Sequence, residues 1–162
     1  MDQDRTTKRA DEPNARPSGS RAEGPSPGRY FIAFAATLVS LCALNFLFHQ
    51  VFAADFFDRE LQGMVLPVRQ LRPLWPTVIY AMSALAMVAF AARGPAMASP
   101  WRAAVLGGGF VGLLTFGTWN LMNYAWLPGW PLSVVLVDTS WHIVCGLLSG
   151  TVLARWLPSS RP

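Results

Sequence analysis

The chain has 162 residues, of which 52% are hydrophobic and only 14% are charged. A water-soluble domain carries charges on about a quarter of its residues, because its surface must be solvated. The charges are also unevenly placed. Ten lie within the first 23 residues, whereas Arg102 and Asp138 are the only two between residues 94 and 154. This composition excludes a soluble domain for most of the chain and predicts an integral membrane protein.

The formal net charge of +4 raises the question of nucleic-acid binding. The basic residues are scattered and flank apolar runs, which is the pattern that orients helices in a membrane. We therefore exclude nucleic acid as a partner. The two cysteines, Cys42 and Cys145, lie inside apolar segments and form no CxxC motif or disulfide framework. Buried thiols of this kind act as small hydrophobic groups.

The first two predicted elements are a tail and a membrane span. Residues 1–29 consist largely of charged residues, Pro, Ser and Gly, so they are predicted to be a disordered cytoplasmic tail. Residues 30–52 carry no formal charge and, at 1.5 Å per residue, are long enough to cross a hydrocarbon core of about 30 Å. A cleaved signal peptide is the alternative. Because its apolar region is usually ~7–15 residues, we expect a retained helix instead.

A short interfacial helix is predicted after the first span. Residues 54–72 contain six charged side chains, while Phe57, Leu61, Met64 and Val65 recur at helical spacing. This amphipathic pattern predicts a helix that lies in the membrane interface and ends before Pro67.

Three further spans follow, at 75–92, 103–126 and 132–156, with the second the shortest. They are separated by a polar turn at 93–102 and a Pro- and Gly-containing hairpin turn at 127–131, and a tail follows at 158–162. The sequence therefore predicts one domain, 30–157, with an all-α fold: an integral membrane bundle of four transmembrane helices.

The distribution of Lys and Arg predicts the orientation. Six lie in the N-terminal tail, two in the 93–102 turn and two near the C-terminus. The other side holds three in residues 53–73 and none in the 127–131 turn. The positive-inside rule then places both termini in the cytoplasm. We expect a bacterial cytoplasmic membrane, with the lipid bilayer as a partner and a second copy or another membrane protein as a further one.

Small residues recur every four positions on the last two spans. Gly108 and Gly112 form a GxxxG pair on the third span, and Gly146 and Gly150 form another on the fourth. This spacing lets helix backbones approach closely in lipid, so these glycines are predicted to serve helix packing and not chemistry.

Polar side chains inside the spans form three pairs. In a bilayer such groups are costly and usually face the bundle interior. Each pair has a spacing of three or four residues and so shares one helix face. The first and third spans run outward and the fourth runs inward, so all six residues are predicted at similar depth toward the extracytoplasmic face. The pairs are Asn45 and His49, Asn120 and Asn123, and Asp138 and His142.

Asp138 is the only acid inside a predicted span. An isolated carboxylate in lipid costs at least about 2.5 kcal/mol or takes up a proton, so it needs a partner, and His142 lies one turn away. Two interpretations stay open. The polar groups either fix helix register through hydrogen bonds worth about 0.6–2 kcal/mol each, or form a pocket that binds or moves a small polar ligand or a proton.

No catalytic motif is present. The sequence contains no HExxH, CxxCH or Gly-rich phosphate loop, and we expect no catalytic residues and no cofactor. The first functional hypothesis is a non-enzymatic protein that packs against itself or a partner. The second is the pocket centred on Asp138. A haem or metal site that uses His49 and His142 is the third, although each histidine stands alone on its helix.

Three stretches carry a family resemblance: RYFIAFAATLVSLCALNFLF, then FFDREL, then FGTWNLMNYAWLPGWPLSVVLVDTSWH. Together they resemble DUF2177, a family of uncharacterised bacterial membrane proteins, over residues 29–157. The most specific part is GTWNLMN at 117–123. The resemblance implies a four-helix membrane protein without implying an activity. The family pattern commonly has Asp at positions 45 and 120 and Gly at 142, so this chain would keep only the carboxylate of Asp138.

Overall fold

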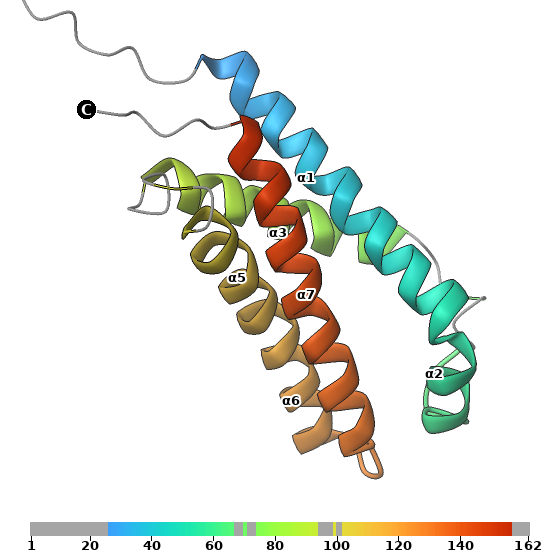
Figure 1. Ribbon diagram of the computed structural model, residues 1–162. Helices are drawn as coiled ribbons and strands as arrows, with labels where there is room; N and C mark the ends of the chain where they lie inside the picture. The colour runs from blue at the N-terminus through green and yellow to red at the C-terminus, as the bar shows by residue number, and fades with distance from the viewer. Residues whose placement is uncertain (1–25, 67–69, 71–73, 94–98, 100–101, 157–162) are drawn as a thin grey trace, which may run out of the picture.

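The computed structural model describes residues 26–66, 70, 74–93, 99 and 102–156, and no strand occurs among them. Figure 1 shows long helices running side by side, with a short helix, α2, at one end and α3 crossing the others obliquely. Three helices are long and apolar enough to span a membrane, and a shorter apolar helix covers Pro76–Ala92. The predicted all-α membrane fold is confirmed.

The first span is α1, Pro27–Leu47, which continues into the π-helical turn η1, Phe48–Phe52. The helix begins three residues before the predicted start, because proline suits the first helical position, where a missing N–H costs no hydrogen bond. One face is buried, and it carries a residue at every fourth position: Ala33, Thr37, Leu41 and Asn45. Of the tail predicted at 1–29, residues 1–25 lie outside the described residues, and Pro27 onward is helical.

The interfacial helix is α2, Ala54–Glu60. Phe57 and Leu61 are buried as predicted, but Met64 and Val65 are exposed, so the prediction of one shared apolar face was wrong for these two. The helix ends at Glu60, and Gly63 then adopts a φ of +80°, which turns the chain away from helical geometry.

The second predicted span is α3, Leu74–Arg93. It packs against α1 and against the start of the third span through its buried residues Ala84, Met87, Val88 and Ala91. The helix is confirmed, whereas its passage through the membrane stays a prediction. Most of the predicted 93–102 turn lies outside the residues that the structure describes.

The third span runs from residue 103 to 126 as four consecutive helical segments. These are η4, Ala103–Gly109; α5, Phe110–Gly112; η5, Leu113–Gly117; and α6, Thr118–Trp126. The fourth span is α7, Leu132–Trp156. Both helices begin and end at the predicted residues, and the division of the chain into tails and one domain stays a prediction. Gly129 turns the hairpin between them with a φ of +82°, a conformation that glycine adopts without strain.

The third span and α7 touch at their glycines. A Cβ added at Gly108 would overlap the carbonyl oxygen of Gly146 and lie 3.3 Å from the Cα of Gly150. A Cβ at Gly112 would overlap the carbonyl oxygen of His142. The four glycines therefore lie where the two backbones meet, as expected for small residues at a helix contact in lipid.

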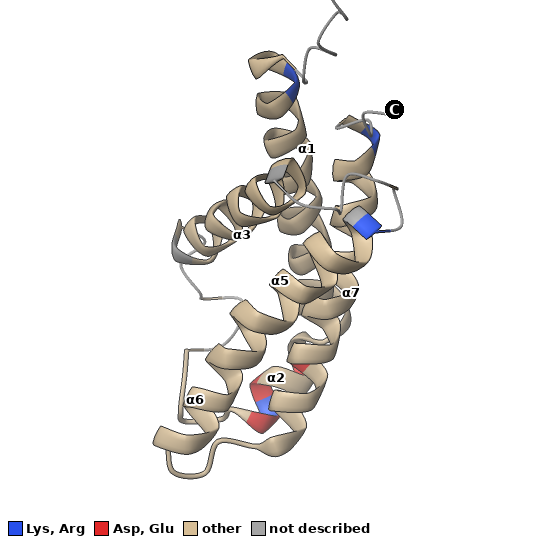
Figure 2. Cartoon of the chain, turned by 90° about the vertical axis from the view of Figure 1, so that its left-hand side faces the viewer, with Lys and Arg blue, Asp and Glu red and all other residues tan. Residues whose placement is uncertain are grey.

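Charged side chains are unevenly distributed between the two ends of the molecule, although α2 carries Arg59 beside its acids (Figure 2). Figure 2 shows basic residues at the end where α1 begins and α7 ends, and acidic residues gathered on α2 at the other end. Asp138, on α7, differs from the acids of α2, because it lies inside the bundle with 8% of its surface exposed.

Candidate functional site

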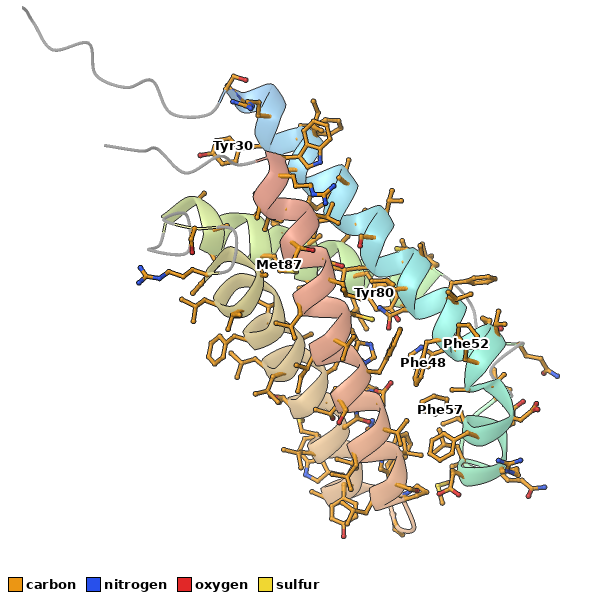
Figure 3. All side chains as sticks on the ribbon, viewed as in Figure 1. Tyr30, Phe48, Phe52, Phe57, Tyr80 and Met87 are labelled. Atoms are coloured by element: carbon orange, nitrogen blue, oxygen red, sulfur yellow. The ribbon has the colours of Figure 1, made fainter. Side chains whose placement is uncertain are left out.

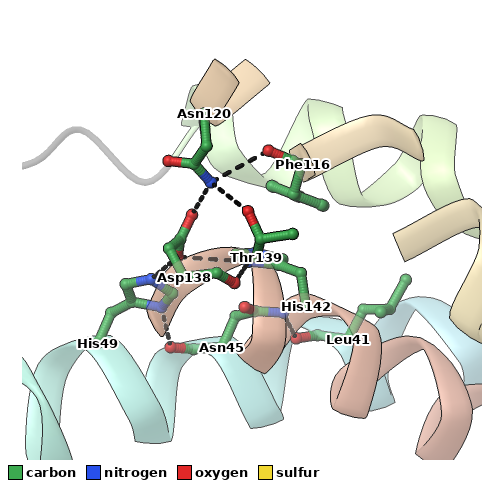
Figure 4. A network of polar contacts seen from close by, with 8 residues as sticks. All are labelled: Leu41, Asn45, His49, Phe116, Asn120, Asp138, Thr139 and His142. Atoms are coloured by element: carbon green, nitrogen blue, oxygen red, sulfur yellow. Dashed lines mark hydrogen bonds and ion pairs between the residues drawn. The ribbon is translucent and has the colours of Figure 1, made fainter. Parts of the chain in front are cut away.

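The site is built around the carboxylate of Asp138. Its Oδ1 lies 2.9 Å from Nε2 of His49, on η1, and its Oδ2 accepts a hydrogen bond of 2.7 Å from Nδ2 of Asn120, on α6. Figure 4 shows these side chains meeting from three helices. His142 completes the group, which we call the Asp138 centre: Asp138, His49, Asn120 and His142.

His142 contacts Asp138 from within α7. Its Nδ1 lies 2.8 Å from the Asp138 carbonyl oxygen and 3.3 Å from Oδ1 of the carboxylate. The residue is 3% exposed, and its ring stacks on Phe116 with centroids 3.5 Å apart and planes 17° apart. The imidazole is therefore held in one orientation by oxygen acceptors on one side and an aromatic face on the other.

The contacts of His49 fix the proton count of the centre. Its Nδ1 lies 3.1 Å from the Asn45 carbonyl oxygen, and its Nε2 faces Oδ1 of Asp138. A carbonyl and a carboxylate both accept, so both ring nitrogens carry a proton when Asp138 is ionised. If Asp138 instead carries the proton, it donates to Nε2. With one proton shared in either of these ways, His49 and Asp138 together carry no net charge.

Local helix geometry brings His49 and Asn120 to the carboxylate. His49 belongs to the π-helical turn η1, and Asn120 follows the π-helical turn η5 by three residues. Such turns are rare in helices and frequent at functional sites, since one extra residue per turn changes the direction of the side chains that follow. Two of the three helices that form the centre, α1 and the third span, therefore carry a π-helical turn next to the centre.

Aromatic rings surround the centre. Phe57 stacks on His49 with centroids 4.9 Å apart, and Phe48 meets the same ring edge-on at 5.2 Å. Tyr80, from α3, lies over His142 at 6.5 Å. Figure 3 shows Phe48, Phe57 and Tyr80 in the space between α7 and the helices opposite it. Apolar surroundings lower the local dielectric, which strengthens hydrogen bonds and ion pairs inside the centre.

The structure places the six predicted residues in three ways. His49, Asn120 and His142 each contact Asp138. Asn45 contributes its backbone carbonyl, while its amide nitrogen donates to the Leu41 carbonyl at 2.9 Å. Asn123 does not join, and its Nδ2 is buried without a partner. Three residues after Asn120, it is rotated by roughly 60° from the direction that faces α7.

Other residues of the site were not anticipated. Thr139 Oγ1 lies 3.4 Å from the Asn120 amide, and the Phe116 carbonyl accepts from the same amide at 3.0 Å. No sequence pattern singles out Phe116, because an aromatic residue in an apolar span is ordinary. His49 reaches the carboxylate more closely than His142, the partner that sequence spacing suggested.

The residues do not fit the haem or metal alternative. No group of three His, Cys, Asp or Glu side chains that could hold a metal ion occurs in the part of the chain that the structure describes. Both ring nitrogens of His49 face oxygen acceptors, and Phe116 covers a face of His142. His49 therefore has no nitrogen free to coordinate a metal.

Comparison with known proteins places the chain in a family. No curated protein and no solved structure matches it. A family model described as a predicted membrane protein, DUF2177, matches residues 30–154, which include every residue of the Asp138 centre. The chain therefore belongs to the DUF2177 family of predicted membrane proteins.

Proposed function

We propose that this membrane protein is not an enzyme and that it takes up and releases a proton at the Asp138 centre. The observation that carries the proposal is one buried carboxylate in contact with two imidazoles. Imidazoles are the side chains that change charge between about pH 5 and 8, and a carboxylate beside them shares their protons.

Proton uptake would be coupled to helix contact. With one shared proton, the pair formed by His49 and Asp138 holds η1 against α7. A second proton on this pair gives it a net positive charge and removes the attraction between an imidazolium and a carboxylate. Loss of the shared proton leaves an uncompensated carboxylate in apolar surroundings, which is costly. The contact between α1 and α7 is therefore strongest when one proton is bound.

The position of the centre supports access from the extracytoplasmic side of a bacterial cytoplasmic membrane. The centre lies toward the end that carries α2, opposite the end where the basic residues gather (Figure 2). The positive-inside rule assigns the basic end, with both termini, to the cytoplasm. The side chain of His49 is 21% exposed, so it offers the proton a route to the surface at the α2 end.

The glycine positions favour this proposal over packing against a partner. Gly108, Gly112 and Gly146 all face the contact between the third span and α7. These glycines pack against backbone within the same chain, so none of them is left to form a small-residue surface for a second copy or another membrane protein. Lipid contact is expected instead for the large hydrophobic side chains exposed on the helices.

The pH dependence of unfolding tests the proposal. The stability of the purified protein in detergent micelles should pass through a maximum and fall on both sides, because gain or loss of a proton weakens the His49–Asp138 pair. Asp138→Asn is nearly isosteric and should flatten the profile. Glu60→Gln is the matched control: it removes one acid from α2, where the side chain accepts a hydrogen bond from Ser133. A profile that Asp138→Asn leaves unchanged would refute the proposal.

A further inference from the structure

Two buried polar atoms beside the Asp138 centre have no protein partner. They are Oδ1 of Asn45 and Nε2 of His142. The residues are 2% and 3% exposed. They lie opposite each other on α1 and α7, because the contacts of His49 with Asp138 and of Ser149 with Ser40 set the register of these antiparallel helices. Figure 4 shows both in the network where these helices meet. Buried polar atoms almost always have a hydrogen-bond partner, so two such atoms together indicate a bound molecule.

The surrounding hydrogen bonds show that both atoms are acceptors. The Asn45 amide nitrogen donates to the Leu41 carbonyl, so the oxygen is the atom left over. Nδ1 of His142 faces two oxygens of Asp138, which accept. The ring proton of neutral His142 is therefore on Nδ1, and Nε2 presents a lone pair. Two acceptors cannot satisfy each other, so the missing partner must donate two hydrogen bonds.

We infer that a water molecule is bound between Asn45 and His142 and donates one hydrogen bond to each. The charge of the site favours a neutral molecule, because His49 and Asp138 already compensate each other. Water is the smallest neutral molecule with two polar hydrogens, and buried waters typically bridge polar groups that lack protein partners.

The inference rests on the proposed proton uptake and deepens it. When His142 gains a proton at Nε2, that nitrogen becomes a donor and needs an acceptor. The bound water then turns, so that its oxygen accepts from Nε2 while one hydrogen still reaches Asn45. His142 can thus gain or lose a proton without losing its hydrogen-bond partner.

Solid-state NMR of the protein with ¹⁵N-labelled histidine in lipid bilayers tests the assignment. The chain has two histidines, so His49→Gln identifies the signals of His142. At neutral pH we expect Nδ1 to be protonated, Nε2 to be bare, and magnetisation from water protons to reach Nε2 at short mixing times. A proton on Nε2 with a bare Nδ1, or no transfer from water, would overturn the inference.

Asn45→Leu provides the matched variant. It removes one of the two acceptors and should abolish the transfer from water to His142, while the backbone carbonyl that contacts His49 stays in place. The maximum in the pH profile should therefore survive, which separates the failure of the water site from the failure of proton uptake. Asn123→Leu, a buried amide outside the centre, should leave the transfer intact. If Asn45→Leu also leaves it intact, the inference is wrong.

A comparison of melting temperatures in two salts distinguishes a bound water molecule from a bound cation that donates the same hydrogen bonds. Methylammonium can donate to both acceptors, whereas tetramethylammonium has the same charge and no N–H group. We expect equal melting temperatures in the two chlorides. A higher melting temperature in methylammonium, lost in Asn45→Leu, would assign the site to an amine cation and overturn the assignment to water. If Asn45→Leu does not fold, the NMR result on the wild-type protein decides alone.

Discussion

Adjacent glycines at the start of the third span should respond oppositely to alanine. A Cβ at Gly108 would overlap the Gly146 carbonyl oxygen and lie 2.6 Å from its carbonyl carbon. A Cβ at Gly107 meets nothing closer than a Phe90 ring carbon at 3.8 Å. Only the first contact involves backbone of α7, which cannot move aside by changing a rotamer. Gly108→Ala should therefore destabilise the protein, and Gly107→Ala should not.

The overlap at Gly108 determines how much stability Gly108→Ala should lose. Restoring contacts of about 3.5 Å to both atoms of the Gly146 carbonyl requires the third span and α7 to separate by considerably more than about 1 Å at Gly108. Overpacking of this kind costs about 1–3 kcal/mol. Both variants gain about 0.5–1 kcal/mol from replacing a helical glycine, so this gain cancels in the comparison. We expect Gly108→Ala to be less stable than Gly107→Ala by about 3 kcal/mol, the upper end, because backbone atoms collide.

Reversible unfolding by SDS in mixed micelles, followed by tryptophan fluorescence, measures the difference. The same separation would stretch the 2.7 Å hydrogen bond between Asn120 and Asp138, so Gly108→Ala should also reduce the height of the stability maximum in the pH profile. Equal stability of the two alanine variants would mean that the helices do not touch at Gly108. The coupling between glycine packing and the Asp138 centre would then be refuted.

Two further predictions follow from the same geometry. Asn120→Leu leaves Oδ2 of Asp138 without its amide donor and should cost about 1–3 kcal/mol, whereas Asn123→Leu removes an unpartnered amide and should cost less than about 0.5 kcal/mol. Similar losses of unfolding free energy in the two variants would contradict the placement of Asn120. Reporter fusions at the two termini should both report cytoplasm, and a fusion in the 127–131 turn should report the opposite side. Termini on opposite sides would remove the argument for access to His49 from outside.

The long helices were predictable because lipid permits few alternatives. Backbone groups in a bilayer must be paired within a helix, so an uncharged apolar run between Pro- and Gly-rich turns becomes a span. The bounds of the two helical segments at 103–126 and 132–156 follow directly from this rule. The oblique course of α3 does not, since it depends on how Met87 and its neighbours pack against other helices, which no local pattern encodes.

The candidate site was predictable in outline and not in detail. Helix direction gives the depth of each residue, at 1.5 Å per position, and a spacing of four gives its side of the helix. These two coordinates suffice to bring His49 and Asp138 near each other. The identity of the closest imidazole depends on η1, and the π-helical turns have no signature in the sequence. For the same reason the aromatic partner Phe116 was missed.

The hydrogen bonds that the Asp138 carboxylate already accepts limit which ligands the centre can bind. A carboxylate has about four lone-pair positions. His49 and Asn120 fill one on each oxygen, and His142 approaches a third at 3.3 Å. A larger polar ligand would have to displace one of these donors and leave it unpaired in apolar surroundings, at a cost of about 1–3 kcal/mol. The proton already shared by Asp138 and His49 needs no such displacement, since it moves along the hydrogen bond that joins them. With three of about four lone-pair positions occupied, the Asp138 carboxylate is better suited to exchange of a proton than to binding of a larger polar ligand.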